Sequence, residues 1–194
     1  MRTKSLLTIG LAAAGMMYGA SVFAAGTPPT TGPFGSGKIT FTGTITNSPC
    51  DIAPGDDAIA VQLGQISYRH LKAVDDVSDS KPFTIHLQNC AFDPDDAVTN
   101  KNLVGKMSKV TVSFSGNADS AKKGYVNTGN AQNVAVQLLK SDNHTILTPN
   151  TDADAQQLQT GNNELNFFAR VVALTTAVTP GTIESSVTYT LKYL

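Results

Sequence analysis

Apolar and polar residues alternate strictly over the last part of the chain, from residue 186 to residue 193. A period of two indicates a β-strand with one buried face, because successive side chains of a strand point to opposite sides. The end of a chain frays unless it is tied into a sheet. We therefore expect a terminal strand that needs a partner, with an apolar face formed by Val187, Tyr189, Leu191 and Tyr193.

A second alternating segment lies near the other end, at residues 37–46. One of its faces carries four threonines, and the other carries Ile39, Phe41, Gly43 and Ile45. The residues before it, 25–36, are rich in glycine and proline and have no periodicity, which predicts a flexible leader. The segment could therefore fold back onto its own molecule or reach into a neighbouring one.

Further strands are predicted at turn-bounded intervals, and no segment has a convincing helical period. Strands at short spacing without helices indicate an antiparallel β-sandwich. Without residues 37–46 there are about six strands, one fewer than in a seven-stranded immunoglobulin-like sandwich. A missing strand would leave an open groove and an unpaired edge. The expected strands are Ile59–Leu63, Phe83–Cys90, Val110–Phe114, Val134–Leu139, Leu165–Ala173 and Ser186–Tyr193.

The first 24 residues have the pattern of a secretory signal peptide. Arg2 and Lys4 precede an apolar stretch, and Val22-Phe23-Ala24 fits the small-x-small cleavage rule, with cleavage after Ala24 or Ala25. The alternative, a transmembrane anchor, is disfavoured because the stretch is short and contains three glycines. We expect an exported chain of about 170 residues with no membrane-inserted segment after cleavage.

The two cysteines, Cys50 and Cys90, both lie in the mature part. In an exported protein an even number of cysteines predicts a disulfide, here a single one, and the alternative is two free buried thiols. A metal site is not expected, because the three histidines lie far apart and show no ligand spacing.

Charge and motifs exclude several classes of function. Without Arg2 and Lys4, 12 basic residues face 15 acidic ones, a net charge of about −3 that argues against nucleic acid and anionic membranes as partners. The cluster of Asp93, Asp95 and Asp96 lacks the spacing of a calcium loop. No nucleophile, zinc-protease or phosphate-loop motif is present, so we expect neither an enzyme nor a cofactor.

The whole chain resembles the pilin subunits of chaperone–usher fimbriae, in particular the major rod pilins of P and type 1 pili. The residues that carry the resemblance follow the signal peptide and recur to the C-terminus. They are GKITFTGTITNSPC at 37–50, VQLGQ at 61–65, LQNC at 87–90, FFARVVA at 167–173, Gly181 and the penultimate Tyr193.

The resemblance implies an incomplete immunoglobulin-like fold, all-β, that lacks its last strand and is completed by a donor strand from another subunit. Residues 25–46 would be the N-terminal extension and residues 47–194 the pilin domain. Ile39, Phe41, Gly43 and Ile45 would enter the neighbour's groove, with Gly43 where that groove is shallow. The acceptor groove, which also binds the chaperone, would comprise Gly181, Val187, Tyr189, Leu191, Tyr193 and the terminal Leu194, where a polar residue is the more usual.

The implied function is that of a structural subunit of a bacterial surface fimbria that supports adhesion. Its implied partners are neighbouring pilins, a periplasmic chaperone and an outer-membrane usher. The alternatives are a low-copy adaptor or minor adhesive subunit of the same fold, and a self-complete secreted sandwich that uses residues 37–46 as its own last strand. A tip adhesin is not expected, because about 170 residues leave no room for a second domain.

Overall fold

A computed structural model describes residues 35–96, 98 and 101–194. The chain divides into two compact units, with the boundary between Thr44 and Ile45. The predicted signal peptide and most of the predicted leader lie outside the described residues. Within the described part of the chain, no helix is both long and apolar enough to cross a membrane.

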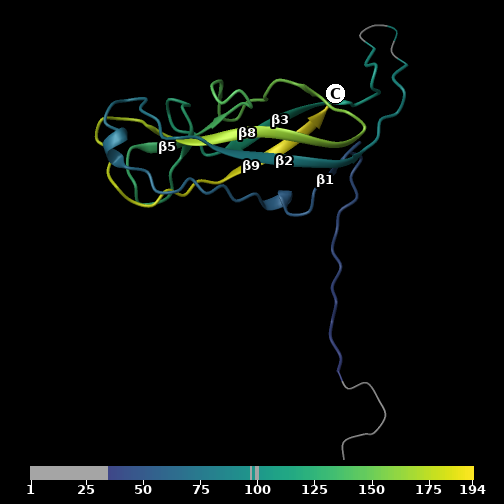
Figure 1. The fold of residues 1–194 in the computed structure, drawn as a ribbon, viewed down its shortest axis with the longest axis horizontal. Helices are drawn as coiled ribbons and strands as arrows, with labels where there is room; N and C mark the ends of the chain where they lie inside the picture. Colours follow the sequence, from purple (N-terminus) through teal and green to yellow (C-terminus); the bar gives the residue numbers. More distant parts are fainter. Residues whose placement is uncertain (1–34, 97, 99–100) are drawn as a thin grey trace, which may run out of the picture. The chain divides into compact units, whose positions relative to one another are not determined.

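The unit from Ile45 to Leu194 consists of two antiparallel sheets (Figure 1), which confirms the predicted all-β class. Two short 3-10 helices, η1 (Asp56–Ala58) and η2 (Tyr68–His70), lie between β1 and β2. The larger sheet has the order β1 (Asp51–Ile52), β2 (Lys81–Cys90), β8 (Gly161–Ala173), β5 (Val134–Leu139) and β4 (Tyr125–Val126), with β6 (Ile146–Leu147) also paired to β5. The smaller has the order β7 (Gln156–Gln157), β3 (Lys109–Gly116) and β9 (Val187–Tyr193).

One hydrophobic core joins the two sheets. Apolar, buried residues recur at every second position along the middle of β2, β8 and β3, so each sheet presents one apolar face to the other. The rings of Phe114 from β3 and Phe167 from β8 meet edge to face, with centroids 5.1 Å apart. The two sheets therefore pack face to face, through Ile85, Leu87, Val110, Val112, Phe114, Leu165 and Phe167.

The predicted disulfide between Cys50 and Cys90 is present. It ties the chain that enters β1 to the end of β2, beside a backbone hydrogen bond from Ala91 N to Pro49 O of 2.9 Å. The two cysteines are separated by 40 residues, and closing a loop of that length stabilises a fold by roughly 4 kcal/mol in the loop-entropy model.

Two predicted strands are absent from the structure. Residues 59–63 alternate between half-buried and exposed side chains as predicted, but they join neither sheet of the described chain. Residues 37–46 also form no strand, and Ile39 and Phe41 are 77% and 88% exposed. The reason is the same in both cases: the side-chain pattern of a strand is present, but a strand also requires a hydrogen-bonded neighbour.

Candidate functional site

The last strand of the described sheets, β9, has one paired and one open edge. On one side it pairs with β3 over its full length, from Val110 opposite Tyr193 to Gly116 opposite Val187. It ends the smaller sheet, so its other edge faces no strand of the described residues. The side chains of β9 alternate between half-buried and exposed, which matches the sequence prediction. The backbone groups along the open edge are a template for a further strand.

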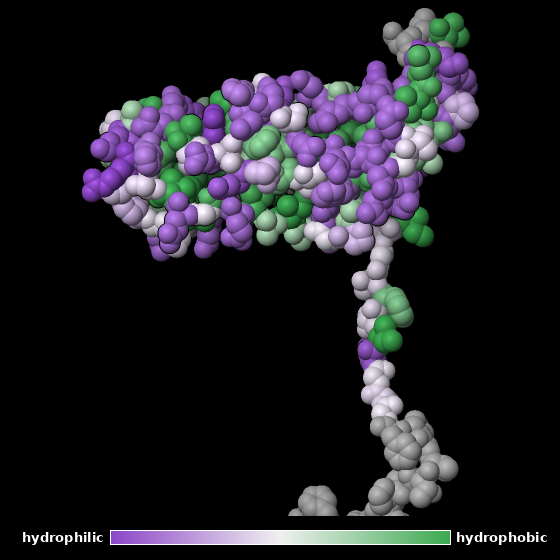
Figure 2. Space-filling view, viewed as in Figure 1, coloured by the Kyte–Doolittle hydropathy of each residue, from purple (hydrophilic) through white to green (hydrophobic). Residues whose placement is uncertain are grey.

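Residues 59–63 form a second apolar row whose half-buried side chains, like those of β9, pack against the main core. The hydroxyl of Tyr189 donates a hydrogen bond of 2.9 Å to the carbonyl of Asp56, which places the start of this row beside β9 (Figure 1). Figure 2 shows hydrophobic side chains exposed between hydrophilic margins along the middle of the domain. We call these two rows the apolar strip: Ile59, Val61, Leu63, Val187, Tyr189, Leu191 and Tyr193.

Hydrogen bonds of Asp56 hold η1 at one end of the apolar strip. Oδ2 of Asp56 accepts hydrogen bonds from the backbone N of His86 at 2.5 Å and pairs with His86 Nδ1 at 2.8 Å. Burial raises the pKa of the Tyr189 hydroxyl, and the charges of Asp56 and Asp57 raise it further. Tyr189 therefore remains a protonated donor at neutral pH, and η1 is attached to both β2 and β9.

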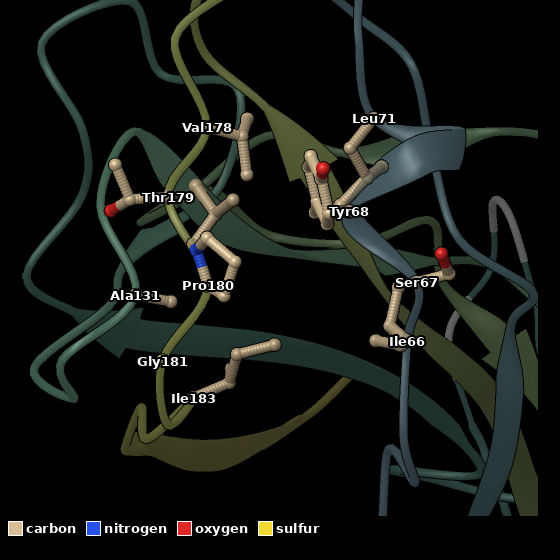
Figure 3. A pocket seen from close by; sticks show the side chains of 11 residues that line it. Ile66, Ser67, Tyr68, Leu71, Ala131, Val178, Thr179, Pro180, Gly181 and Ile183 are labelled. Carbon is tan, nitrogen blue, oxygen red and sulfur yellow. The ribbon is translucent and has the colours of Figure 1, made fainter.

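The other end of the strip opens into a pocket with a cavity volume of about 200 Å³. Residues 66–71 and residues 178–183 form two of its walls, and in Figure 3 Pro180 and Ile183 face Ile66 and Tyr68 across the open space. Leu63 packs against both hydrophobic clusters of the domain, so the strip continues into the pocket. The lining residues are Ile66, Ser67, Tyr68, Leu71, Ala131, Val134, Val178, Thr179, Pro180, Gly181 and Ile183.

The acceptor residues predicted from the sequence run from the pocket, along β9, to the end of the chain. Gly181 lines the pocket, and a Cβ there would lie 2.3 Å from the backbone N of Ala131. Leu194 continues the β9 ladder, because its N donates to the carbonyl of Lys109 at 2.8 Å. Burial raises the pKa of the Tyr193 hydroxyl at the same end.

The predicted donor residues have a different environment. Ile39, Phe41 and Ile45 are among the most exposed apolar residues of the described chain. A Cβ added at Gly43 would meet no atom within 4 Å. Among the described residues, therefore, nothing covers this alternating apolar face.

Sequence reasoning missed several residues around the strip. The row at residues 59–63 was expected as an ordinary strand, although its alternation already placed it against the core. Ile66, Leu71 and Ile183 of the pocket belong to segments without any period, so no pattern could have indicated them. Among the described residues, no group of three or more His, Cys, Asp or Glu side chains could hold a metal ion.

Comparisons with known proteins match this architecture. The profile of the Fimbrial protein family matches residues 39–194. Long polar fimbria protein A of Salmonella typhimurium is 34% identical over 82% of this chain and 84% of its own. The A chain of the type-1 fimbrial protein of Escherichia coli is 30% identical over 100% of both chains.

A solved subunit of a chaperone–usher pilus, from a structure concerned with rod uncoiling, has the same fold. It aligns with a TM-score of 0.67 and 26% identity, over 86% of this chain and 100% of the pilus subunit. Together these matches show that the chain belongs to the fimbrial protein family, the non-enzymatic chaperone–usher pilins of surface fimbriae, and is related to the major rod pilins.

Proposed function

We propose that this protein is a structural subunit of a bacterial fimbria that polymerises by donor-strand exchange and so supports adhesion. The observation that carries the proposal is the open edge of β9 beside the half-buried apolar strip. An unpaired edge with apolar side chains is a site for the addition of a strand. In this proposal the domain is an immunoglobulin-like sandwich that lacks one strand.

The donor in the proposal is the segment Ile39–Ile45 of another copy. Its four inward positions span seven residues, as do the four inward positions of β9 from Val187 to Tyr193. Every strand pair of the two sheets is antiparallel, which supports an antiparallel orientation for the added strand. Ile45 would then lie toward the pocket and Ile39 toward Tyr193.

Gly43 supports a specific fit between donor and acceptor. A glycine inside a strand weakens it and often marks a close approach of another chain. In the part of the chain that the structure describes, Gly43 makes no contact that would require a glycine, since no atom lies within 4 Å of its Cβ position. In the proposal, the need for glycine arises only when the segment enters the groove of a neighbour.

The proposed partners follow from the exposed strip and from the family. Until a neighbour's strand arrives, an open apolar edge is an aggregation hazard. A periplasmic chaperone would cover Val187, Tyr189, Leu191 and Tyr193 and bind the carboxylate of Leu194, and an outer-membrane usher would then direct the exchange. A low-copy adaptor would use the same interface, and counting this subunit in purified fibres distinguishes the roles: we expect it to be the most abundant protein.

A labelled peptide of residues 37–46 tests the proposal. We expect it to bind the full chain, with saturable fluorescence anisotropy, because its apolar face matches the strip. A peptide with Gly43→Val should bind at least about fivefold more weakly, since overpacking a fitted site costs about 1–3 kcal/mol. A peptide with Thr42→Val, altered on the outward face, is the matched control and should bind as the original does. Absence of binding by the original peptide would refute the proposal.

A further inference from the structure

We infer that Asn127 is a positioning residue for the pocket: it holds the wall formed by residues 178–184 in the shape that receives an incoming strand. The inference rests on the proposed function, because it assumes that the pocket belongs to the acceptor site. Asn127 itself does not line the pocket. It acts through the backbone of the wall that it holds.

The amide of Asn127 is fully used in this role. Its Nδ2 donates to the carbonyl of Ala131 at 2.8 Å and to that of Thr182 at 3.2 Å. Its Oδ1 accepts from the backbone N of Gly129 at 3.1 Å and of Glu184 at 2.7 Å. Two donors and two acceptor sites are all that an asparagine side chain offers. One side chain thus joins the loop after β4 to the segment before β9.

The wall depends on such bonds because it is not part of a sheet. Residues 180–186 form no strand. The β-type pairing at this part of the wall is an isolated bridge between Gln132 and Thr179. Direct backbone bonds help at two points, from Ala131 N to Thr182 O at 3.0 Å and from Thr128 N to Glu184 O at 2.8 Å. Asn127 bonds to the same two wall residues, Thr182 and Glu184, and so links the loop to the wall at both points.

The bonds of Asn127 lie where the backbones of the loop and the wall approach each other closely. A Cβ at Gly129 would lie 2.3 Å from the carbonyl oxygen of Thr182, so the loop and the wall are nearly in contact. A shift of the wall would move Pro180 and Ile183, which face the open space in Figure 3. Without Asn127 the wall would sample other positions, and an incoming strand would find a formed pocket less often.

The variant Asn127→Asp tests the inference through its pH profile. At pH 7.5 the carboxylate would face the carbonyls of Ala131 and Thr182 with no proton to donate. We expect the association rate of the residue 37–46 peptide with the full chain to fall about tenfold. At pH 4 partial protonation restores one donor, so the rate should return to within about threefold of the wild-type rate. The peptide, blocked at both ends, has only Lys38 as an ionisable group, which keeps its charge at both pH values.

Two further proteins serve as controls. The wild-type chain, measured at both pH values, corrects for any effect of pH that does not arise from residue 127. Asn163 makes a similar pair of bonds to Gln159 at the start of β8, accepting from its N at 2.8 Å and donating to its carbonyl at 2.7 Å, and Asn163→Asp removes the donated bond. It should lose thermal stability to a similar degree but keep the wild-type association rate. Should Asn127→Asp not fold, Asn127→Ala, which removes the bonds without adding a charge, should slow association about threefold or more.

The outcomes separate this inference from the proposed function. If the wild-type chain does not bind the peptide, the proposed function fails and the inference with it. If the wild-type chain binds the peptide and the Asn127 variants associate with it at the wild-type rate, the positioning role is wrong and the proposed function stands. Equal slowing by Asn163→Asp would also overturn the role, because it would show a general effect of stability.

Discussion

Gly181 illustrates how single residues shape the candidate site. The resemblance to pilins placed it in the acceptor groove, and the structure gives a local reason for a glycine there. The backbone of Asn130 and Ala131 occupies the space where a side chain would begin, with a Cβ only 2.4 Å from the Asn130 carbonyl carbon and 2.3 Å from Ala131 N. The glycine thus allows the loop after β4 to pack directly onto the wall of the pocket.

The variant Gly181→Ala should therefore be less stable than the wild type. One added methyl group forces two backbones apart, and such overpacking costs about 1–3 kcal/mol. We expect a lower midpoint of denaturant unfolding with an unchanged slope. Gly37→Ala is the matched control, because no atom lies within 4 Å of its Cβ position, and its midpoint should not move. A wild-type midpoint for Gly181→Ala would show that the loop yields to the methyl group at little cost.

At the scale of elements, the sequence predicted side-chain patterns better than pairing. The alternation of β2, β3, β8 and β9 was sufficient to place them, because each turns an apolar face to the core, whereas β5 is an apolar run buried on both faces. The two-residue strands β1, β4, β6 and β7 are too short to show a period. Residues 59–63 have the pattern without the pairing, since pairing depends on what lies beside a strand. The pocket could not be predicted either, because it is formed by segments whose sequence has no period.

Removal of residues 25–45 separates the two halves of the proposed exchange. The shortened chain keeps the apolar strip and the open edge of β9, so we expect it to bind the residue 37–46 peptide with the affinity of the full chain. It has no donor segment, so it should form no fibres by electron microscopy under conditions in which the full chain assembles. Fibres of normal length from the shortened chain would place the donor elsewhere.

At the scale of the whole molecule, the proposed contact is directional. Each copy would give one strand and accept one, at different places on its surface. A contact between two unlike surfaces does not close on itself unless the rotation between copies closes a ring, and it otherwise generates an open helical filament. The missing strand, which leaves a single chain incomplete, would then allow the assembly to grow to any length.

A directional assembly has one acceptor end, and the length of the filament should respond to a molecule that fills it. Addition of the residue 37–46 peptide to an assembling full chain should shorten the fibres in proportion to the ratio of peptide to subunit. The physical reason is that a capped subunit can still donate its own strand but can accept none, so growth ends there. Length distributions from electron microscopy measure the effect, and the Gly43→Val peptide is the control that should leave them unchanged. If instead the original peptide leaves fibre length unchanged at a saturating ratio, the filament is held by surfaces other than the open edge of β9.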